Sequence, residues 1–141
     1  MQKIEVISRA LIIKEDKILV CRDKKNKNYF FPGGHIEVGE FSREALKREL
    51  MEELSLKTKN FYFIGLVENR YTARKKEYHE INFIYYTTYY NFKKKSVENH
   101  LDFFLFSIDE FKKADIRPKK LKEAILTWKK DKKFFHIETI D

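Results

Sequence analysis

The feature that most constrains the fold is an amphipathic helix that follows a glycine turn, within GGHIEVGEFSREALKRELMEELSL at 33–56. Leu46, Leu50 and Leu54 recur every four residues, which places them on one face of an α-helix. Ser42 precedes this stripe and is the predicted N-cap. A helix with one apolar face must bury that face against another layer. The segment therefore predicts a helix that packs on a sheet.

The segments on either side of this helix carry strand patterns, because β-branched and aromatic residues dominate them and polar turns separate them. We predict strands at 4–16, 17–23, 59–71, 78–90, 101–108 and 133–140, the last at a sheet edge, and helical segments at 109–114 and 117–131. Both faces of the first two strands are largely apolar, which indicates a sheet covered on two sides. This order of elements predicts one mixed α/β sandwich domain over residues 1–141.

Three carboxylates lie at the end of the predicted helix, although the chain has a net charge of +8. Glu49, Glu52 and Glu53 fall within an arc of roughly 100° that borders the leucine stripe. Glu49 and Glu53 form a like-charged i,i+4 pair, and the helix dipole disfavours negative charge at a C-terminus. Local stability therefore does not explain the cluster. A divalent cation does, because Mg²⁺ takes oxygen ligands and is often shared between carboxylates and phosphates.

The stretch from Gly34 to Leu56 resembles the Nudix box, G-x5-E-x7-R-E-U-x-E-E-x-G-U, in which U is a bulky aliphatic residue. The matching positions are Gly34, Glu40, Arg48, Glu49, Leu50, Glu52, Glu53 and Leu56. The preceding FPGGHIE is also similar to the common lead-in of that family. Ser55 departs from the pattern, which has glycine there. Serine in the left-handed C-cap that glycine would allow costs about 1 kcal/mol, and we infer a modified loop and not lost chemistry.

The resemblance implies a Nudix-type α/β/α sandwich with a mixed central sheet. It also implies a hydrolase that depends on a divalent metal and cleaves the pyrophosphate linkage of a nucleoside diphosphate derivative. Substrates of this class include nucleoside triphosphates and dinucleoside polyphosphates. Water would attack phosphorus, and the cofactor would be Mg²⁺, with Mn²⁺ as a substitute.

Site roles carry over by position from the same resemblance. The implied metal ligands are Glu49, Glu52 and Glu53. One of these, or a glutamate from a later loop, would orient or deprotonate the water. Arg48 would hold a glutamate by hydrogen bonding. Glu40 would either join the metals or brace the loop, and the carbonyl of Gly33 is a further candidate ligand.

Outside the box, several residues are candidates for contact with substrate. Arg9 and Arg22 lie in or at the end of apolar strand segments and could reach phosphate, with structural pairing as the alternative. His35, beside the glycines, could touch phosphate or be an ordinary turn residue. Tyr71 could stack on a base or fill the core. The candidates for a general base or an outer metal ligand are Glu80, Glu98 and Asp102.

The excess of lysine leaves two other functions open, because positive charge suits either a solvated surface or attraction of a polyanion. One alternative is a non-catalytic Nudix-like module that binds RNA or a nucleotide, and the other is a hydrolase of capped RNA ends. We favour a small-molecule nucleotide as the partner, since the acidic cluster is intact. Nudix proteins are often homodimers, which makes a homodimer a further expectation.

The remaining composition bears on location and redox chemistry. Cys21 is the only cysteine, so no internal disulfide is possible, and its apolar surroundings predict a buried thiol. No apolar run reaches the length of a membrane span, and the N-terminal residues lack the layout of a signal peptide. We therefore expect a cytoplasmic protein that does not bind membranes.

Overall fold

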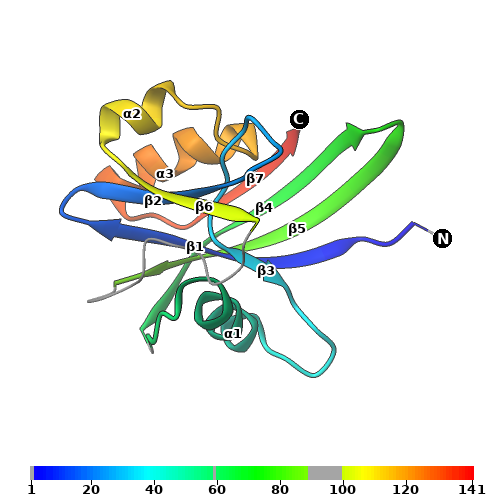
Figure 1. The fold of residues 1–141 in the computed structure, drawn as a ribbon, viewed down its shortest axis with the longest axis horizontal. Coiled ribbons are helices and arrows are strands. Elements are labelled where there is room, and N and C mark those ends of the chain that lie inside the picture. The colour runs from blue at the N-terminus through cyan, green and yellow to red at the C-terminus, as the bar shows by residue number, and fades with distance from the viewer. Residues whose placement is uncertain (1, 59, 89–99) are drawn as a thin grey trace.

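The computed structural model describes residues 2–58, 60–88 and 100–141. The elements in these ranges are β1 (Glu5–Lys14), β2 (Lys17–Asp23), β3 (Gly33–His35), α1 (Ser42–Leu54), β4 (Phe61–Ala73), β5 (Lys76–Thr87), β6 (Leu101–Phe106), α2 (Ile108–Lys113), α3 (Lys119–Asp131) and β7 (Phe135–Ile140). The strand order is β6-β2-β1-β5-β4-β7, and β3 also pairs with β1. Figure 1 shows α1 on one side of the sheet and α2 and α3 on the other.

The sheet is mixed, because β1 runs parallel to β5 and β4 runs parallel to β7, whereas the other pairs are antiparallel. With helices on both faces, the predicted α/β/α sandwich with a mixed central sheet is confirmed. The predicted edge position of the last strand is also confirmed, since β7 ends the strand order. No helix in the described part of the chain is both long enough and apolar enough to cross a lipid bilayer.

β1 lies in the middle of the sheet and positions the glycine turn. One of its edges pairs with β5 over most of its length. On the other edge, the first half of β1 pairs with β3, and only its last residues pair with β2. Ser8 pairs with Gly34 and Arg9 pairs with Gly33. The glycine turn is therefore fixed by backbone pairing to the middle of β1.

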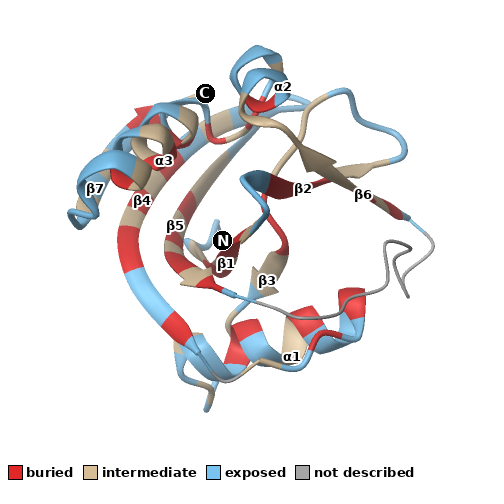
Figure 2. Cartoon of the chain, turned by 90° about the vertical axis from the view of Figure 1, so that its left-hand side faces the viewer, coloured by how far each residue is buried: buried red, intermediate tan, exposed pale blue. Residues whose placement is uncertain are grey.

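Alternate residues of β1 face two separate apolar clusters. Ala10 and Ile12 are fully buried on the side of α1, and Leu11 is fully buried on the side of α2 and α3. The first cluster also contains the predicted leucine stripe: Leu46, Leu50 and Leu54. Figure 2 shows buried positions along the central strands and on α1. The predicted burial of the first strands on both faces is therefore confirmed.

The start of α1 differs from the prediction by one residue. Phe41, and not Ser42, is the N-cap, with extended backbone at φ −76° and ψ 158°. The backbone N–H of Phe41 donates to the carboxylate of Glu44 at 3.0 Å, which ties the first turn together. The hydroxyl of Ser42 instead forms a hydrogen bond with the hydroxyl of Tyr85 at 2.5 Å. The side chain that the sequence predicts as the N-cap, that of Ser42, is therefore used in a tertiary hydrogen bond.

The end of α1 agrees with the prediction. Ser55 has φ 53° and ψ 30°, which is the left-handed conformation. Its N–H donates to the carbonyl of Met51 at 3.0 Å, and the N–H of Leu56 donates to that of Leu50 at 3.2 Å. Leu56 is buried, as the apolar residue that follows such a cap often is. The serine therefore adopts the backbone conformation that glycine favours, and the helix ends where the box requires.

The two strands that follow α1 in the sequence have bounds that differ slightly from those predicted. The strand predicted at 59–71 is β4, which ends two residues later, and the strand predicted at 78–90 is β5, which begins two residues earlier. The last residues of the second prediction, and the lysine run at 93–95, lie outside the described residues. Cys21 is fully buried, as predicted.

Candidate active site

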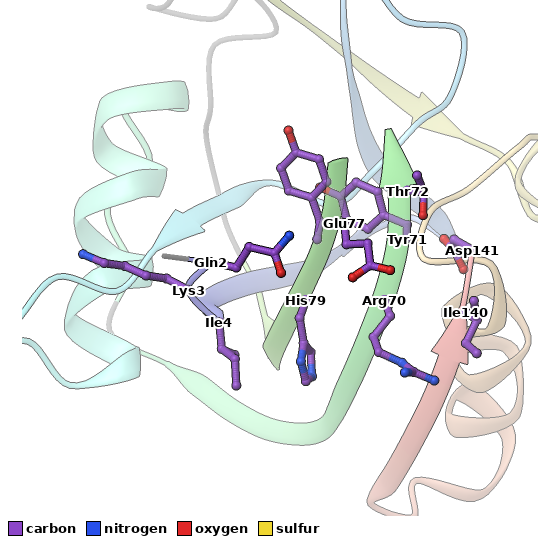
Figure 3. Close-up of a pocket in the computed structure, with 11 residues that line it drawn as sticks. Gln2, Lys3, Ile4, Arg70, Tyr71, Thr72, Glu77, His79, Ile140 and Asp141 are labelled. Carbon is purple, nitrogen blue, oxygen red and sulfur yellow. The ribbon is translucent and has the colours of Figure 1, made fainter. Parts of the chain in front are cut away.

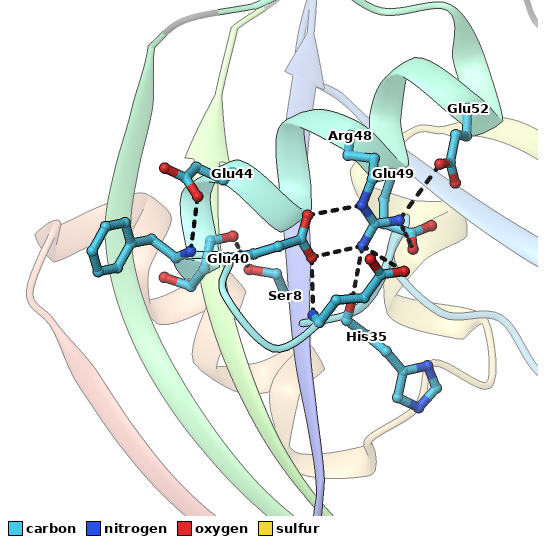
Figure 4. Close-up of polar contacts among 10 residues, drawn as sticks. Ser8, His35, Glu40, Glu44, Arg48, Glu49 and Glu52 are labelled. Atoms are coloured by element: carbon cyan, nitrogen blue, oxygen red, sulfur yellow. Dashed lines mark hydrogen bonds and ion pairs between the residues drawn. The ribbon is translucent and has the colours of Figure 1, made fainter.

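Arg48 is the centre of a hydrogen-bond network on α1 (Figure 4). Its Nε and Nη2 donate to the two carboxylate oxygens of Glu40, each at 2.9 Å. Its Nη1 donates to Oε1 of Glu49 at 2.9 Å, and its Nη2 also donates to the backbone carbonyl of His35 at 3.1 Å. One guanidinium thus joins the loop before the helix, the end of β3 and an acidic residue of the helix itself.

The same guanidinium lies close to two further carboxylates. Oε1 of Glu52 is 3.5 Å from Nη1, and Oε1 of Glu37 is 3.8 Å from Nη2. With Glu40 and Glu49, four carboxylates surround Arg48, which leaves a formal charge of −3 on these five residues when all are ionised. A divalent cation would offset most of that charge.

The partners of Glu40 keep its carboxylate ionised far below neutral pH. The hydrogen bonds from Arg48 and then from the backbone N–H of Glu37 lower the pKa of Glu40 to about 2. The hydrogen bonds that Arg48 donates to Glu40 also raise the pKa of Arg48 above its usual value. In this structure Glu40 braces the loop, which is one of the two roles that the resemblance implies.

Glu53 lies on the inner side of the helix and is only 3% exposed. Its charge reaches the thiol of Cys21, whose pKa is raised first by burial and second by Glu53, while Arg9 acts in the opposite direction. A buried carboxylate is costly to keep ionised unless positive charge faces it, and a cation at this end of α1 would supply such charge.

The glycine turn leaves room for one of the carboxylates. A Cβ atom on Gly34 would overlap the carboxylate of Glu49, so only glycine lets that group lie against the backbone. Gly33 has φ +143°, and a Cβ there would overlap the carbonyl of Ser8. Together with the helix, the turn offers carboxylate and carbonyl oxygens, which are the ligands that Mg²⁺ and Mn²⁺ prefer. The residues therefore fit the metal that the resemblance implies.

Three of the predicted substrate contacts meet in a pocket of about 620 Å³ on the opposite face of the sheet from α1: Arg9, Tyr71 and Glu80. Asn69 and Asn82 join this group, although the sequence analysis did not single them out. Asn82 is fully buried and accepts a hydrogen bond from Nε of Arg9 at 2.9 Å, and Asn69 lines the pocket. Buried asparagines within strand patterns were the available signal, because strands are depleted in asparagine.

The remaining candidates lie elsewhere. Arg22 donates to the hydroxyl of Tyr29 at 3.1 Å, and its guanidinium lies over the Tyr29 ring. Asp102 pairs with Arg22 across β2 and β6. The side chain of His35 is 63% exposed and lies 3.7 Å from Glu5. Glu98 lies outside the described residues.

A second group of possible metal ligands lies away from the box, on β4 and β7. Ligand atoms of Glu68, His136 and Glu138 all lie within 4.8 Å of one another. Nε2 of His136 is 2.7 Å from Oε2 of Glu68, so this pair is already joined by a hydrogen bond. Parallel pairing of β4 with β7 brings the group together, which sequence spacing does not reveal.

A further pocket, of about 500 Å³, lies at the far end of the β4–β5 hairpin. Figure 3 shows Arg70, Glu77 and His79 among the side chains that line it. Of the predicted substrate contacts it contains only Tyr71, so we do not assign it to the candidate active site.

Comparison with known proteins agrees with this geometry. The model of the NUDIX domain family matches residues 5–127. Two curated relatives named 8-oxo-dGTP diphosphatase come from Buchnera aphidicola. The protein from subspecies Schizaphis graminum (strain Sg) is 36% identical over 66 residues, which are 44% of this chain and 51% of that protein. The protein from subspecies Acyrthosiphon pisum (strain APS) is 34% identical over 65 residues, which are 45% of this chain and 52% of that protein.

The chain thus spans about half the length of these curated relatives. Among solved structures, the crystal structure of the "mMutator MutT protein" from Bacillus halodurans has a TM-score of 0.76 at 18% identity, over 97% of this chain and 90% of that chain. At that identity the likeness shows a shared fold. Because the family model covers most of the sequence, the chain belongs to the Nudix family. The resemblance seen in the box at Gly34–Leu56 is therefore confirmed.

Proposed function

We propose that this protein is a Nudix pyrophosphohydrolase that uses Mg²⁺, or Mn²⁺ in its place, to cleave a nucleoside diphosphate derivative. The observation that carries the proposal is the set of carboxylates around Arg48. The space that Gly34 leaves for the carboxylate of Glu49 supports it. This set keeps an excess of negative charge at the end of a rigid helix, which is the arrangement that a phosphate-bound cation needs. Cytoplasmic location, a single domain and a homodimer stay predictions.

In the proposed reaction, the oxygen of a water molecule attacks a phosphorus atom, and the bond from that phosphorus to the bridging oxygen breaks. Glu49, Glu52 and Glu53 would hold the metal, which neutralises phosphate oxygens and activates water when it is bound. Arg48 acts as a positioning residue, because its hydrogen bonds fix Glu49 relative to the loop. The proton of the attacking water passes to a carboxylate or to solvent, and both products leave as phosphates.

A purine nucleoside triphosphate is the first substrate to test. The supporting observation is the name of the two curated relatives, which are 8-oxo-dGTP diphosphatases. The pocket of about 620 Å³ on the far face of the sheet is of a size that suits one nucleoside. Binding of RNA through the basic surface stays the alternative prediction.

The test is a panel of substrates with Mg²⁺ or Mn²⁺: plain and oxidised nucleoside triphosphates, ADP-ribose, dinucleoside polyphosphates, nucleotide sugars and capped RNA. We expect turnover of at least one nucleotide, none after chelation of the metal, and ¹⁸O from labelled water in a phosphate product. Label found only in a sugar or alcohol product would refute attack at phosphorus. No turnover on the whole panel, together with RNA binding that weakens steeply with salt, would favour the alternative.

A further inference from the structure

Ser42 is the residue that the sequence predicts as the N-cap of α1, and the structure gives it a different use. Its hydroxyl forms a hydrogen bond with the hydroxyl of Tyr85 on β5 at 2.5 Å. Its backbone carbonyl accepts a hydrogen bond from the hydroxyl of Ser8 on β1 at 2.7 Å (Figure 4). Two hydroxyl groups from two paired strands therefore hold one residue in the first turn of the helix.

This arrangement departs from the local rules for a helix start. Phe41 occupies the N-cap position, where its side chain offers no acceptor to the unpaired N–H groups and is 78% exposed. Ser8 is fully buried and Tyr85 is 4% exposed, so the hydrogen bonds to Ser42 lie between the helix and the sheet. A local rule that is broken in favour of a buried polar contact is typical of a functional requirement.

The middle of β1 holds the glycine turn as well as the helix. Ser8 pairs through its backbone with Gly34, so its main chain fixes the turn while its side chain fixes the start of α1. The carboxylate of Glu49 lies against Gly34, where a Cβ atom would be only 2.3 Å from the carboxylate carbon. The turn and the acidic part of α1 therefore share one support, and the contact between them leaves little room for movement.

The length of α1 makes the position of its first turn important for the acidic residues. Glu49 follows Ser42 by seven residues, which is about 10 Å along the helix axis. A tilt of about 5° at the first turn would then move Glu49 by about 1 Å. Burial of the leucine stripe does not by itself set this angle, because the hydrophobic effect is non-directional. A misplacement of about 1 Å can lower a rate about 100-fold.

We infer, on the basis of the proposed metal-dependent hydrolysis, that Ser8, Ser42 and Tyr85 are positioning residues, which set the angle of α1 so that its carboxylates meet the cation beside the glycine turn. None of the three is a fixed position of the box. They act through Glu49 and the other carboxylates of the helix. Loss of one hydroxyl therefore weakens metal binding and slows hydrolysis in a protein that is still folded.

The affinity for Mn²⁺ alone, measured from the paramagnetic resonance signal of the free ion, tests this inference without a nucleotide. Ser42→Ala and Tyr85→Phe each remove one hydroxyl, and each should weaken Mn²⁺ binding and lower kcat by about tenfold or more. The double variant should be no worse than either single variant, because both changes break the same hydrogen bond. Ser42→Thr keeps a hydroxyl and should restore both values. Tyr86→Phe removes a hydroxyl from the next residue of β5, which packs near Trp128 on the side of α3, and should change neither.

Urea denaturation in metal-free buffer separates positioning from folding. A variant that is only less stable still binds Mn²⁺ with wild-type affinity while nearly all of it is folded. If Ser42→Ala or Tyr85→Phe does not fold, Ser8→Ala should show the same loss of affinity. Wild-type affinity and kcat in the folded variants, or additive losses in the double variant, would overturn the inference. If the wild type binds Mn²⁺ but hydrolyses no nucleotide, only the proposed reaction is refuted, because the affinities of the variants still decide this inference.

Discussion

Replacing Ser55 with glycine tests whether the departure from the box concerns only backbone conformation. Ser55 ends α1 at φ 53° and ψ 30°, where a residue with a Cβ is disfavoured by about 1–2 kcal/mol. Glycine removes that cost, but it also stabilises the unfolded chain by about 0.5–1 kcal/mol, because it raises the conformational entropy of that state. We therefore expect the free energy of unfolding to increase by about 0.5 kcal/mol, and the Tm by about 1–2 °C for a chain of this size.

Urea denaturation and turnover should be measured on the same preparations, with Ser55→Ala as the matched control. Alanine removes the hydroxyl and keeps the Cβ, so its stability should remain within about 0.5 kcal/mol of the wild type. All three proteins should turn over substrate at the same rate. A glycine variant that is less stable than the wild type would refute the conformational argument. Loss of turnover in both variants at unchanged stability would instead assign a role to the hydroxyl.

Other predictions concern the acidic network. Glu52→Gln and Glu53→Gln should each lower turnover by at least about 100-fold without lowering stability in metal-free buffer. Mg²⁺ at ten times its Kd should stabilise the wild type by about 1.4 kcal/mol and each variant by less, as melting curves with and without the ion would show. Gly34→Ala should displace the carboxylate of Glu49 and reduce turnover while circular dichroism stays unchanged. Glu40 has its pKa lowered from 4.5 to about 2, so its stabilising effect is present above pH 4.5 and is lost as the pH falls toward 2. Glu40→Gln should therefore flatten the acid side of the stability–pH curve, and an unchanged slope would contradict this.

The fold was predictable where periodicity and burial agree. The spacing of Leu46, Leu50 and Leu54 identified the buried face of α1, because side chains four residues apart share one side of a helix. The helix start was predicted one residue late, since the best local capping residue, Ser42, bonds to Tyr85 instead. Capping propensity depends on nearby residues in the sequence and does not include a partner in a different strand. Capping rules therefore fail where a tertiary hydrogen bond competes for the same hydroxyl.

The candidate site likewise has one part that the sequence predicts, the acidic cluster, and one part that it does not, the pocket. The acidic cluster of Glu49, Glu52 and Glu53 could be recognised because these three residues share one helix, where sequence spacing fixes geometry. The pocket could not, because it depends on strand register: Asn69 meets Glu80 only through the β4–β5 pairing. The sequence considers Tyr71 and Glu80 separately, whereas in the structure the hydroxyl of Tyr71 donates to Glu80 at 3.2 Å. The sequence alone also does not reveal that Asn69 lies beside Glu80.

The net charge of the chain and the charge of the group around Arg48 have opposite signs. The protein carries a net charge of +8, yet four carboxylates lie within 4.0 Å of Arg48. Long-range positive potential raises the rate at which a polyphosphate arrives, but such a ligand would be repelled by the acidic end of α1. Under the proposed function, a divalent cation would resolve this conflict, because it would bind the carboxylates and the phosphates at once. Arg48 also holds Glu40 in the loop before the helix, through hydrogen bonds from Nε and Nη2 to the two carboxylate oxygens. Substrate affinity should therefore depend strongly on metal concentration and only weakly on the surface lysines. A set of lysine substitutions that changes only the salt dependence of KM would agree with this expectation.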